Sequence, residues 1–185
     1  VEITPMVDAY FRRRRGGSRL RRGNKMARER MAILYDLSAA RDAMVLGTSN
    51  KTELLLGYGT IHGDMASGSN PLGDLYKTQV RMLALRLGLP EDIVWKIPTA
   101  EVWAGQADEK DLGYSYAAID RLLVLLVDRR ATPSEAVAAG FPRSMVERII
   151  DRIVRSQFKR RPPLIAKLSP RTVGVDFRYP RDWGR

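Results

Sequence analysis

The chain has 185 residues, with 32 lysines and arginines against 21 aspartates and glutamates, which gives a net charge of +11 at pH 7. Its 44% hydrophobic and 29% charged residues are typical of one globular domain and exclude disordered and collagen-like chains. It has no cysteine and one histidine, which excludes disulfides, thiolate metal sites and cysteine nucleophiles and disfavours a Ser-His-Asp triad.

Neither a membrane span nor a secretion signal is predicted. The longest apolar run, residues 122–127, is far shorter than the roughly 18 residues of a spanning helix. The first residues lack a basic stretch followed by an apolar one, which a signal peptide requires. We therefore expect a soluble, cytoplasmic protein.

The N-terminal region combines an apolar alternation with a strongly basic run. Val1 and Ile3 alternate with polar residues and predict the end of a β-strand. Residues 12–25, RRRRGGSRLRRGNK, hold eight basic side chains. They predict either a solvent-exposed loop or a segment that grips the phosphates of a nucleic acid or a nucleotide, because arginine forks match phosphate oxygens.

A helix, a strand and a second helix are predicted next. From Ala27 the apolar spacing is helical. Residues 43–49, AMVLGTS, predict a strand, and Ser49 is expected to cap a helix that ends at Gly57. Ligands collect at the carboxyl ends of strands in open α/β sheets, so Thr48 is expected to lie at a binding edge.

The middle of the chain predicts a long loop followed by a helix. Residues 57–74 are rich in glycine and predict a functional loop. Asp74 is expected to cap a helix that buries Val80, Leu83, Ala84 and Leu87 and ends at Gly88. A short strand is predicted at residues 94–97. The acidic cluster of Asp108, Glu109 and Asp111 predicts a solvated turn, with a divalent cation site as the alternative.

Three helices and an extended tail complete the chain. Ser115 is expected to cap the first helix, and Thr132 with Glu135 predicts a capping box at the start of the second. The third is expected to start at Pro142, and the basic, proline-rich tail to lie extended. The strand-turn-helix pattern predicts a parallel α/β sheet, although the chain supplies few of the strands that such a sheet needs.

Three of these residues suit nucleotide chemistry on their own. A hydroxyl at Thr48 and a cation at Lys77 match phosphate oxygens, and Mg²⁺ prefers a carboxylate such as Glu53 together with phosphates. The alternatives are that Glu53 complements a helix dipole, that Lys77 lies on a solvated helix face, and that Thr48 is a turn hydroxyl. For His62 the alternative is packing on Tyr58.

Four long blocks resemble the NAD synthetase family in the order in which the family has them. The blocks are GNKMARERMAILYDLSA, LGTSNKTELLLGYGTIHGDMASGSNPLGDLYKTQV, PTAEVWAGQADEKDLGYSY and FKRRPPLIAKLSPRTVGVDFRYPRDWG. The resemblance implies a Rossmann-like parallel-sheet fold of the adenine nucleotide alpha-hydrolase type, with a helical C-terminal portion. It also implies a ligase, usually a homodimer, that adenylates the carboxylate of deamido-NAD⁺ with ATP and Mg²⁺ and lets ammonia displace AMP.

The resemblance assigns roles to individual residues. It implies ATP contacts at Thr48, Lys77 and Thr99, a Mg²⁺ or substrate contact at Glu53, and deamido-NAD⁺ contacts at Arg28 and Lys159. Many members have lysine where Ile61 stands, aspartate near Gly68 and histidine where Phe158 stands, so those roles are not transferred. Nearby replacements are expected among Tyr58, Thr60 and His62.

The family's SGG(I/V)DS pyrophosphate loop does not occur in residues 1–185. The chain therefore resembles the C-terminal two-thirds of a short member, one domain truncated at its N-terminus, and is expected to be inactive alone. Two other functions remain open: a basic nucleic-acid-binding module, supported by the arginine run, and a non-catalytic family fragment.

Overall fold

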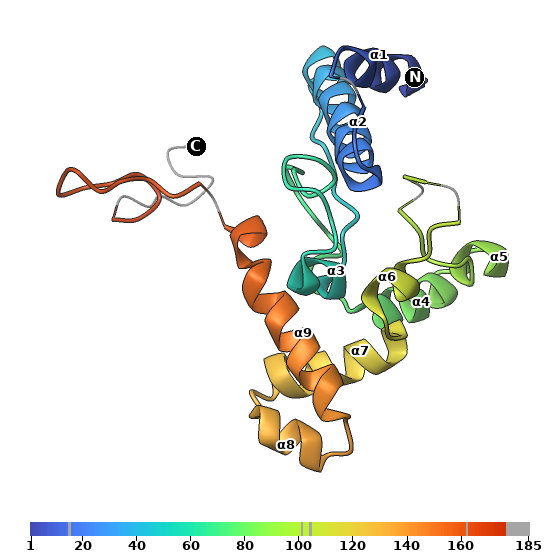
Figure 1. The fold of residues 1–185 in the computed structure, drawn as a ribbon, viewed down its shortest axis with the longest axis vertical. Helices are drawn as coiled ribbons and strands as arrows, with labels where there is room; N and C mark the ends of the chain where they lie inside the picture. Colours follow the sequence, from blue (N-terminus) through green and yellow to red (C-terminus); the bar gives the residue numbers. More distant parts are fainter. Residues whose placement is uncertain (15, 101, 104, 162, 177–185) are drawn as a thin grey trace.

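The computed structural model describes residues 1–14, 16–100, 102–103, 105–161 and 163–176. The helices in these ranges are α1 (Thr4–Arg13), α2 (Arg19–Arg41), α3 (Lys51–Leu56), α4 (Lys77–Arg86), α5 (Glu91–Val94), α6 (Asp108–Leu112), α7 (Tyr116–Leu123), the π-helical η1 (Val124–Asp128), α8 (Pro133–Ala138), α9 (Arg143–Arg155) and the 3-10 helix η2 (Gln157–Arg160). Figure 1 shows the α1–α2 hairpin at one end, α7 to α9 at the other and α3 between them.

The N-terminus is helical, so the strand predicted around Val1 and Ile3 is wrong. Pro5 lies in the first turn of α1, where its fixed φ favours the helix. Ile3, Val7 and Phe11 are buried at a spacing of four residues, which is the helical period rather than the strand period of two. This face packs α1 against α2.

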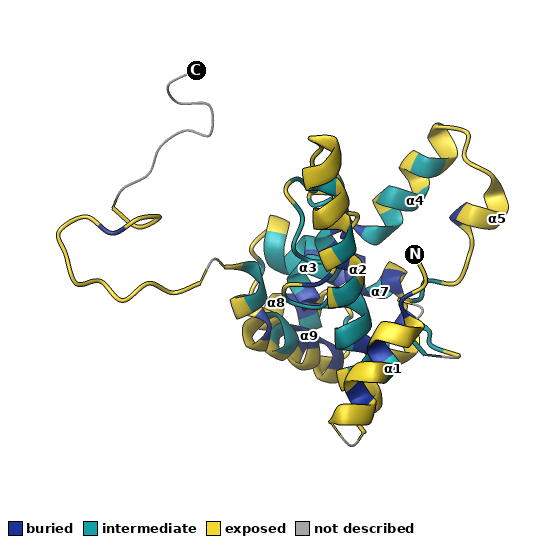
Figure 2. Ribbon diagram, turned by 90° about the horizontal axis from the view of Figure 1, so that it is seen from above, coloured by how far each residue is buried: buried dark blue, intermediate teal, exposed yellow. Residues whose placement is uncertain are grey.

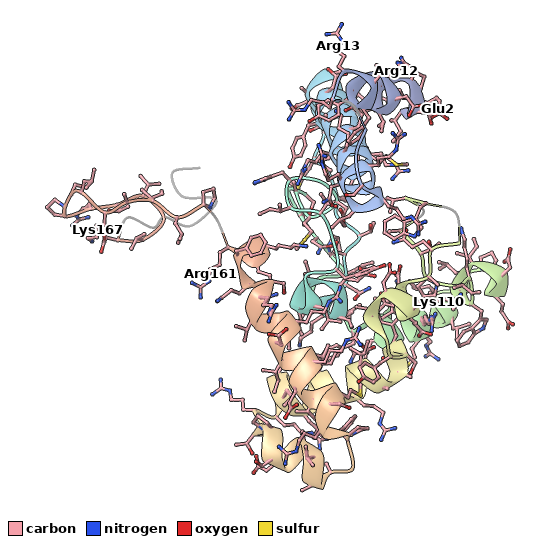
Figure 3. The ribbon with its side chains drawn as sticks, in the orientation of Figure 1. Glu2, Arg12, Arg13, Lys110, Arg161 and Lys167 are labelled. Atoms are coloured by element: carbon pink, nitrogen blue, oxygen red, sulfur yellow. The ribbon has the colours of Figure 1, made fainter. Side chains whose placement is uncertain are left out.

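Most of the basic run is helical rather than the predicted loop, and of its described residues only Arg14 and residues 16–18 lie between the two helices. Arg12 and Arg13 end α1, where cations complement the helix dipole, and they project outward in Figure 3. The Ser18 side chain accepts a hydrogen bond from the Arg21 N–H and starts α2 at Arg19, well before the predicted start at Ala27.

The predicted strand at residues 43–49 is reduced to one parallel bridge between Leu46 and Ser69. The Gly47 N–H donates to the Ser69 carbonyl at 2.7 Å, and the Gly68 N–H donates to the Val45 carbonyl at 3.0 Å. A parallel sheet needs further paired strands and two covered faces. No strand longer than this bridge occurs in the described residues, so the expected sheet is not found there.

The two central helices begin at other residues than predicted. Asn50 rather than Ser49 caps α3, and its side chain forms a capping box with Glu53. Helix α4 starts after Tyr76 rather than at Asp74, and none of its residues is buried. Of the face predicted to be buried, Val80 and Ala84 are half-buried, whereas Leu83 and Leu87 are exposed.

The predicted strand at residues 94–97 is also wrong. Pro90 precedes a single helical turn, α5, and Trp95 and Ile97 after it are exposed. The acidic cluster is not a solvated turn but helix α6, in which Asp108 is buried. In contrast, the caps predicted at Ser115 and Thr132 are confirmed.

The main core lies where α3, α6, α7, α8 and α9 meet, seen as the dark region of Figure 2. Its fully buried members are Leu56, Leu112, Tyr116, Ile119, Leu122, Leu123, Ala136, Met145, Val146 and Ile149, together with Tyr76 from the turn before α4. Helix α9 begins after Pro142, as predicted, and turns one apolar stripe toward α3 and α8. Residues 163–176 are extended, as predicted, but they lead away from this core and do not lie over its surface; the rest of the predicted tail, residues 177–185, lies outside the described residues.

We expect Ile149→Ala to destabilise the chain by about 2–5 kcal/mol, because it removes a side chain that is 1% exposed and leaves a cavity. Val154→Ala is the matched control on the same helix, since Val154 is 56% exposed. Urea denaturation followed by circular dichroism measures both. Equal midpoints would show that α9 does not pack as described.

Candidate functional site

A cleft of about 990 Å³ lies between the α1–α2 hairpin and the helical core. Its lining comes from α2, residues 46–49, α3, residues 57–60 and 64, α4, residues 93–94, 96–100, 102–103 and 106, α6 and the C-terminal helices. The charged side chains on this lining are Arg30, Glu53, Asp64, Lys77, Arg81, Lys96, Asp108, Asp111, Arg152 and Lys159. Cations outnumber carboxylates, so the cleft suits an anionic ligand such as a nucleotide.

Seven of the nine residues predicted from the sequence line this cleft. They are Thr48, Glu53, Tyr58, Thr60, Lys77, Thr99 and Lys159. Because they come from four separate stretches of the chain, the fold rather than the sequence brings them together.

The other two predicted residues do not line the cleft. The Arg28 guanidinium donates through Nε to the Ile61 carbonyl at 3.1 Å and so ties α2 to the glycine-rich loop. His62 is exposed in that loop at a φ of +60°, in the left-handed region. Both lie beside the cleft wall formed by Thr60.

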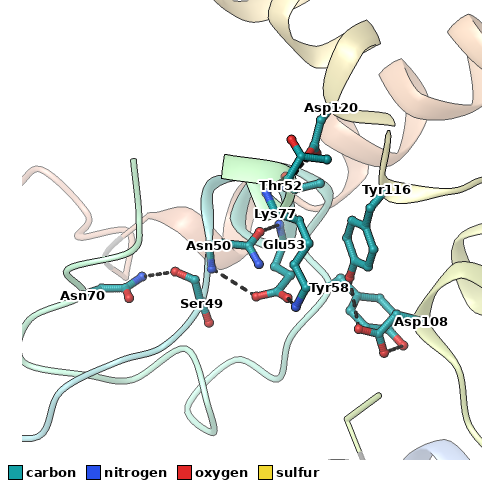
Figure 4. Close-up of polar contacts among 11 residues, drawn as sticks. Ser49, Asn50, Thr52, Glu53, Tyr58, Asn70, Lys77, Asp108, Tyr116 and Asp120 are labelled. Carbon is teal, nitrogen blue, oxygen red and sulfur yellow. Dashed lines mark hydrogen bonds and ion pairs between the residues drawn. The ribbon is translucent and has the colours of Figure 1, made fainter. Parts of the chain in front are cut away.

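Glu53 and Lys77 form an ion pair on the cleft wall. Lys77 Nζ lies 3.0 Å from Glu53 Oε1, and the Asn50 N–H donates to Glu53 Oε2 at 3.0 Å. Figure 4 shows Glu53 between these two partners. The helix-start role considered for Glu53 is therefore present, and Lys77 does not lie on a solvated helix face.

Three cations from the C-terminal helices hold the carbonyl end of α3. Lys159 Nζ donates to the carbonyls of Gly57 and Gly59, at 2.8 Å each. Arg160 donates to the carbonyls of Leu54 and Leu55, and Arg152 Nε donates to the Leu56 carbonyl. Cations at a helix C-terminus satisfy its free carbonyls and complement its dipole.

The end of α3 packs closely against the C-terminal helices, and this packing leaves Lys159 in a poorly solvated position. Gly57 ends α3 at a φ of +60°, and a Cβ there would lie 2.2 Å from Ser156 Cβ, so only glycine fits. Burial lowers the pKa of Lys159 and of Arg152.

A second polar cluster on the cleft wall surrounds Tyr58. The Tyr58 hydroxyl lies 3.0 Å from Asp108 Oδ1 and 2.9 Å from Asp111 Oδ2, and Tyr116 donates to Asp108 Oδ2 at 3.1 Å. Burial and the neighbouring carboxylates raise the pKa of both tyrosines, so both hydroxyls stay protonated. The acidic spacing indicated these carboxylates, but no pattern in the sequence indicated that Tyr58 and Tyr116 are their partners.

Comparison with known proteins gives a consistent result. The NAD synthase family model matches residues 1–163. An NH₃-dependent NAD⁺ synthetase of Trichlorobacter lovleyi is 57% identical over 185 residues, which are all of this chain and 68% of that protein.

Solved structures are similar as well. The NMN synthetase of Francisella tularensis has a TM-score of 0.77 at 32% identity, over 90% of this chain and 65% of that one. The NH₃-dependent NAD synthetase of Campylobacter jejuni, in complex with a nitrate ion, has a TM-score of 0.72 at 34% identity, over 90% and 64%. This chain thus spans about two thirds of the length of its relatives.

We expect Lys159→Met to loosen the loop at residues 57–60, because it removes two charged hydrogen bonds to that loop. Amide hydrogen exchange there should accelerate by about tenfold. Lys110→Met, at an exposed residue of α6, is the control and should leave this exchange unchanged. Unchanged exchange in Lys159→Met would contradict the proposed anchoring.

Proposed function

The chain belongs to the NAD synthase family, and we propose that it forms the nucleotide-binding and substrate-binding part of an NH₃-dependent NAD⁺ synthetase. The reaction is ATP-dependent amidation of deamido-NAD⁺, with an adenylated intermediate, release of AMP and pyrophosphate, and ammonia as the nitrogen donor. The observation that supports it best is the cleft of about 990 Å³, where seven of the nine residues predicted for this chemistry meet.

A carboxylate reacts poorly with ammonia, so transfer of AMP to it must supply a leaving group. The negative charge of the transferred phosphate then needs neutralisation by fixed cations. Lys77 supports this proposal, because it lines the cleft and its side chain is 22% exposed. We propose that Lys77, Thr48 and Thr99 contact ATP.

The described residues suit a Mg²⁺ ion that is held partly by the phosphates of ATP better than they suit an ion held by protein side chains alone. They contain no group of three or more His, Cys, Asp or Glu side chains arranged for a metal. Mg²⁺ in such sites commonly takes one or two carboxylates together with phosphate oxygens. We propose Glu53 as that carboxylate, and the ion would neutralise phosphate charge there.

The substrate side of the cleft lies at the loop that ends α3. We propose that Tyr58, Thr60 and Lys159 contact deamido-NAD⁺ there. Arg28 and His62 lie outside the lining, so we propose that they act at its edge through the loop they share with Thr60. Asp64 also lines this side and accepts the Thr60 N–H.

The remaining parts of the proposal concern assembly and location. We propose a homodimer, as the resemblance implies, and the exposed apolar side chains Met82, Leu87, Ile93 and Trp95 on and after α4 supply surface for such contacts. Within the described residues no helix has both the length and the apolar character needed to cross a membrane. We propose that the enzyme acts in the cytoplasm, where ATP is supplied.

We expect Glu53→Gln to weaken the effect of Mg²⁺ on ATP binding. Glutamine retains an oxygen for the capping box but loses the charge that a cation needs. Calorimetry with and without Mg²⁺ should show the Mg²⁺-dependent gain in ATP affinity reduced by about tenfold. Glu135→Gln is the matched control, because Glu135 completes the same kind of capping box on α8, outside the cleft.

Each of the alternative functions predicts a different result for the wild-type chain. A non-catalytic family fragment would show no response to ATP or deamido-NAD⁺ in a thermal melt. A nucleic-acid-binding module would bind RNA or DNA with an affinity that falls steeply with salt. Preference for the nicotinate mononucleotide over deamido-NAD⁺ would point to a mononucleotide amidase instead.

A further inference from the structure

A buried aspartate on α7 accepts a hydrogen bond from the start of α4, although it does not line the cleft. Asp120 is 3% exposed, and both of its carboxylate oxygens accept hydrogen bonds. The Thr52 hydroxyl donates to Oδ1 at 2.6 Å, and the Thr78 N–H donates to Oδ2 at 2.8 Å. Figure 4 shows Asp120 above Thr52, on the side of Thr52 away from the Glu53 carboxylate.

Thr52 extends this contact to Lys77 itself. Its hydroxyl oxygen, which is fully buried, also accepts the Lys77 N–H at 3.0 Å. The first two N–H groups of α4 therefore both donate hydrogen bonds: Lys77 donates to Thr52 of α3, and Thr78 donates to Asp120 of α7. A helix start has free N–H groups and a partial positive charge, so a carboxylate at this point stabilises it strongly.

The same face of α7 also holds the side chain of Lys77. Tyr116 lies four residues before Asp120, hence on the same side of the helix. The Lys77 ammonium lies 5.3 Å from the centre of the Tyr116 ring and 3.0 Å from Glu53 Oε1. Thus α7 contacts the Lys77 ammonium directly through Tyr116 and holds the Lys77 backbone indirectly, through the hydrogen bonds of Asp120 to Thr52 and Thr78.

We propose that Asp120 is a positioning residue for Lys77. By holding the first turn of α4 against α3 through Thr52, it sets where the Lys77 ammonium meets the cleft. A buried carboxylate costs free energy to desolvate, and an apolar side chain would fill this position in the core without that cost. The contact of Lys77 with phosphate rests on the proposed function, whereas the position of its ammonium does not.

A second aspartate offers an internal control. Asp128 of η1 accepts hydrogen bonds from Lys51 of α3 at 2.9 Å and from Tyr76 before α4 at 3.0 Å. It therefore links the same part of the fold, but neither Asp128 nor Lys51 lines the cleft. Lys51 and Lys77 side chains are each 22% exposed, so their intrinsic accessibility is matched.

The test is the rate at which each lysine of the folded chain is acetylated by an N-hydroxysuccinimide ester, followed by mass spectrometry. Asp120→Asn should displace Lys77 from Glu53 and raise the Lys77 rate relative to Lys51 by about fivefold, which corresponds to a loss of about 1 kcal/mol from the Lys77–Glu53 ion pair. Asp128→Asn should raise the Lys51 rate instead and leave Lys77 unchanged. If the ratio of the Lys77 to the Lys51 acetylation rate is the same in Asp120→Asn and in the wild type, the proposal is overturned.

Substitutions at Thr52 test the same link should Asp120→Asn fail to fold. Thr52→Val removes the hydroxyl and should raise the Lys77 rate as well, whereas Thr52→Ser keeps the hydroxyl and should restore the wild-type ratio. A general loosening of the core would raise both lysine rates in every variant, and that result would also overturn the proposal.

A binding experiment separates this proposal from the proposed function. If Lys77 contacts ATP, Asp120→Asn should weaken ATP binding by about tenfold in the wild-type background but little in a Lys77→Met background. Additive losses would show that Asp120 does not act through Lys77. A wild-type chain that binds no ATP would refute the proposed function alone, since the acetylation ratio would still decide the role of Asp120.

Discussion

The arrangement of the cleft depends on how the two ends of α3 are held. This helix has only six residues, Lys51–Leu56, and a helix of that length is not stable alone in water. At its start the Asn50–Glu53 capping box satisfies free N–H groups, and at its end Lys159, Arg160 and Arg152 bind the free carbonyls. Each end thus receives side chains of the charge that its dipole favours.

This arrangement connects the core to the cleft. Leu56 of α3 packs among the buried residues of α7 and α9, while Glu53, about one turn earlier, reaches the cleft wall. The loop at residues 57–60 leaves α3 at Gly57, in contact with Ser156 and Lys159. A shift of α9 would therefore move the side chains on the substrate side together rather than one at a time.

Local patterns predicted some of the local features of this structure. The capping box at Thr132, the cap at Ser115 and the amphipathic α9 depend on residues within four positions of one another, and the structure confirms them. Long-range partners could not be predicted in this way. The bond from Thr52 to Asp120 spans 68 positions, and nothing in the spacing of either residue indicates it. The N-terminal strand was wrong because it was predicted from Val1 and Ile3 alone, whereas Ile3 belongs to the buried series Ile3, Val7 and Phe11, which has helical spacing.

The distance along the chain between α3 and its partners has a consequence for synthesis. Asp120 follows Thr52 by 68 positions, and Lys159 follows Gly57 by 102. Because a ribosome makes the chain from its N-terminus, Leu54, Leu55 and Leu56 emerge long before the side chains that hold them. Domains fold as units during translation, so this run of leucines stays open to chaperones until α9 and η2 have left the exit tunnel.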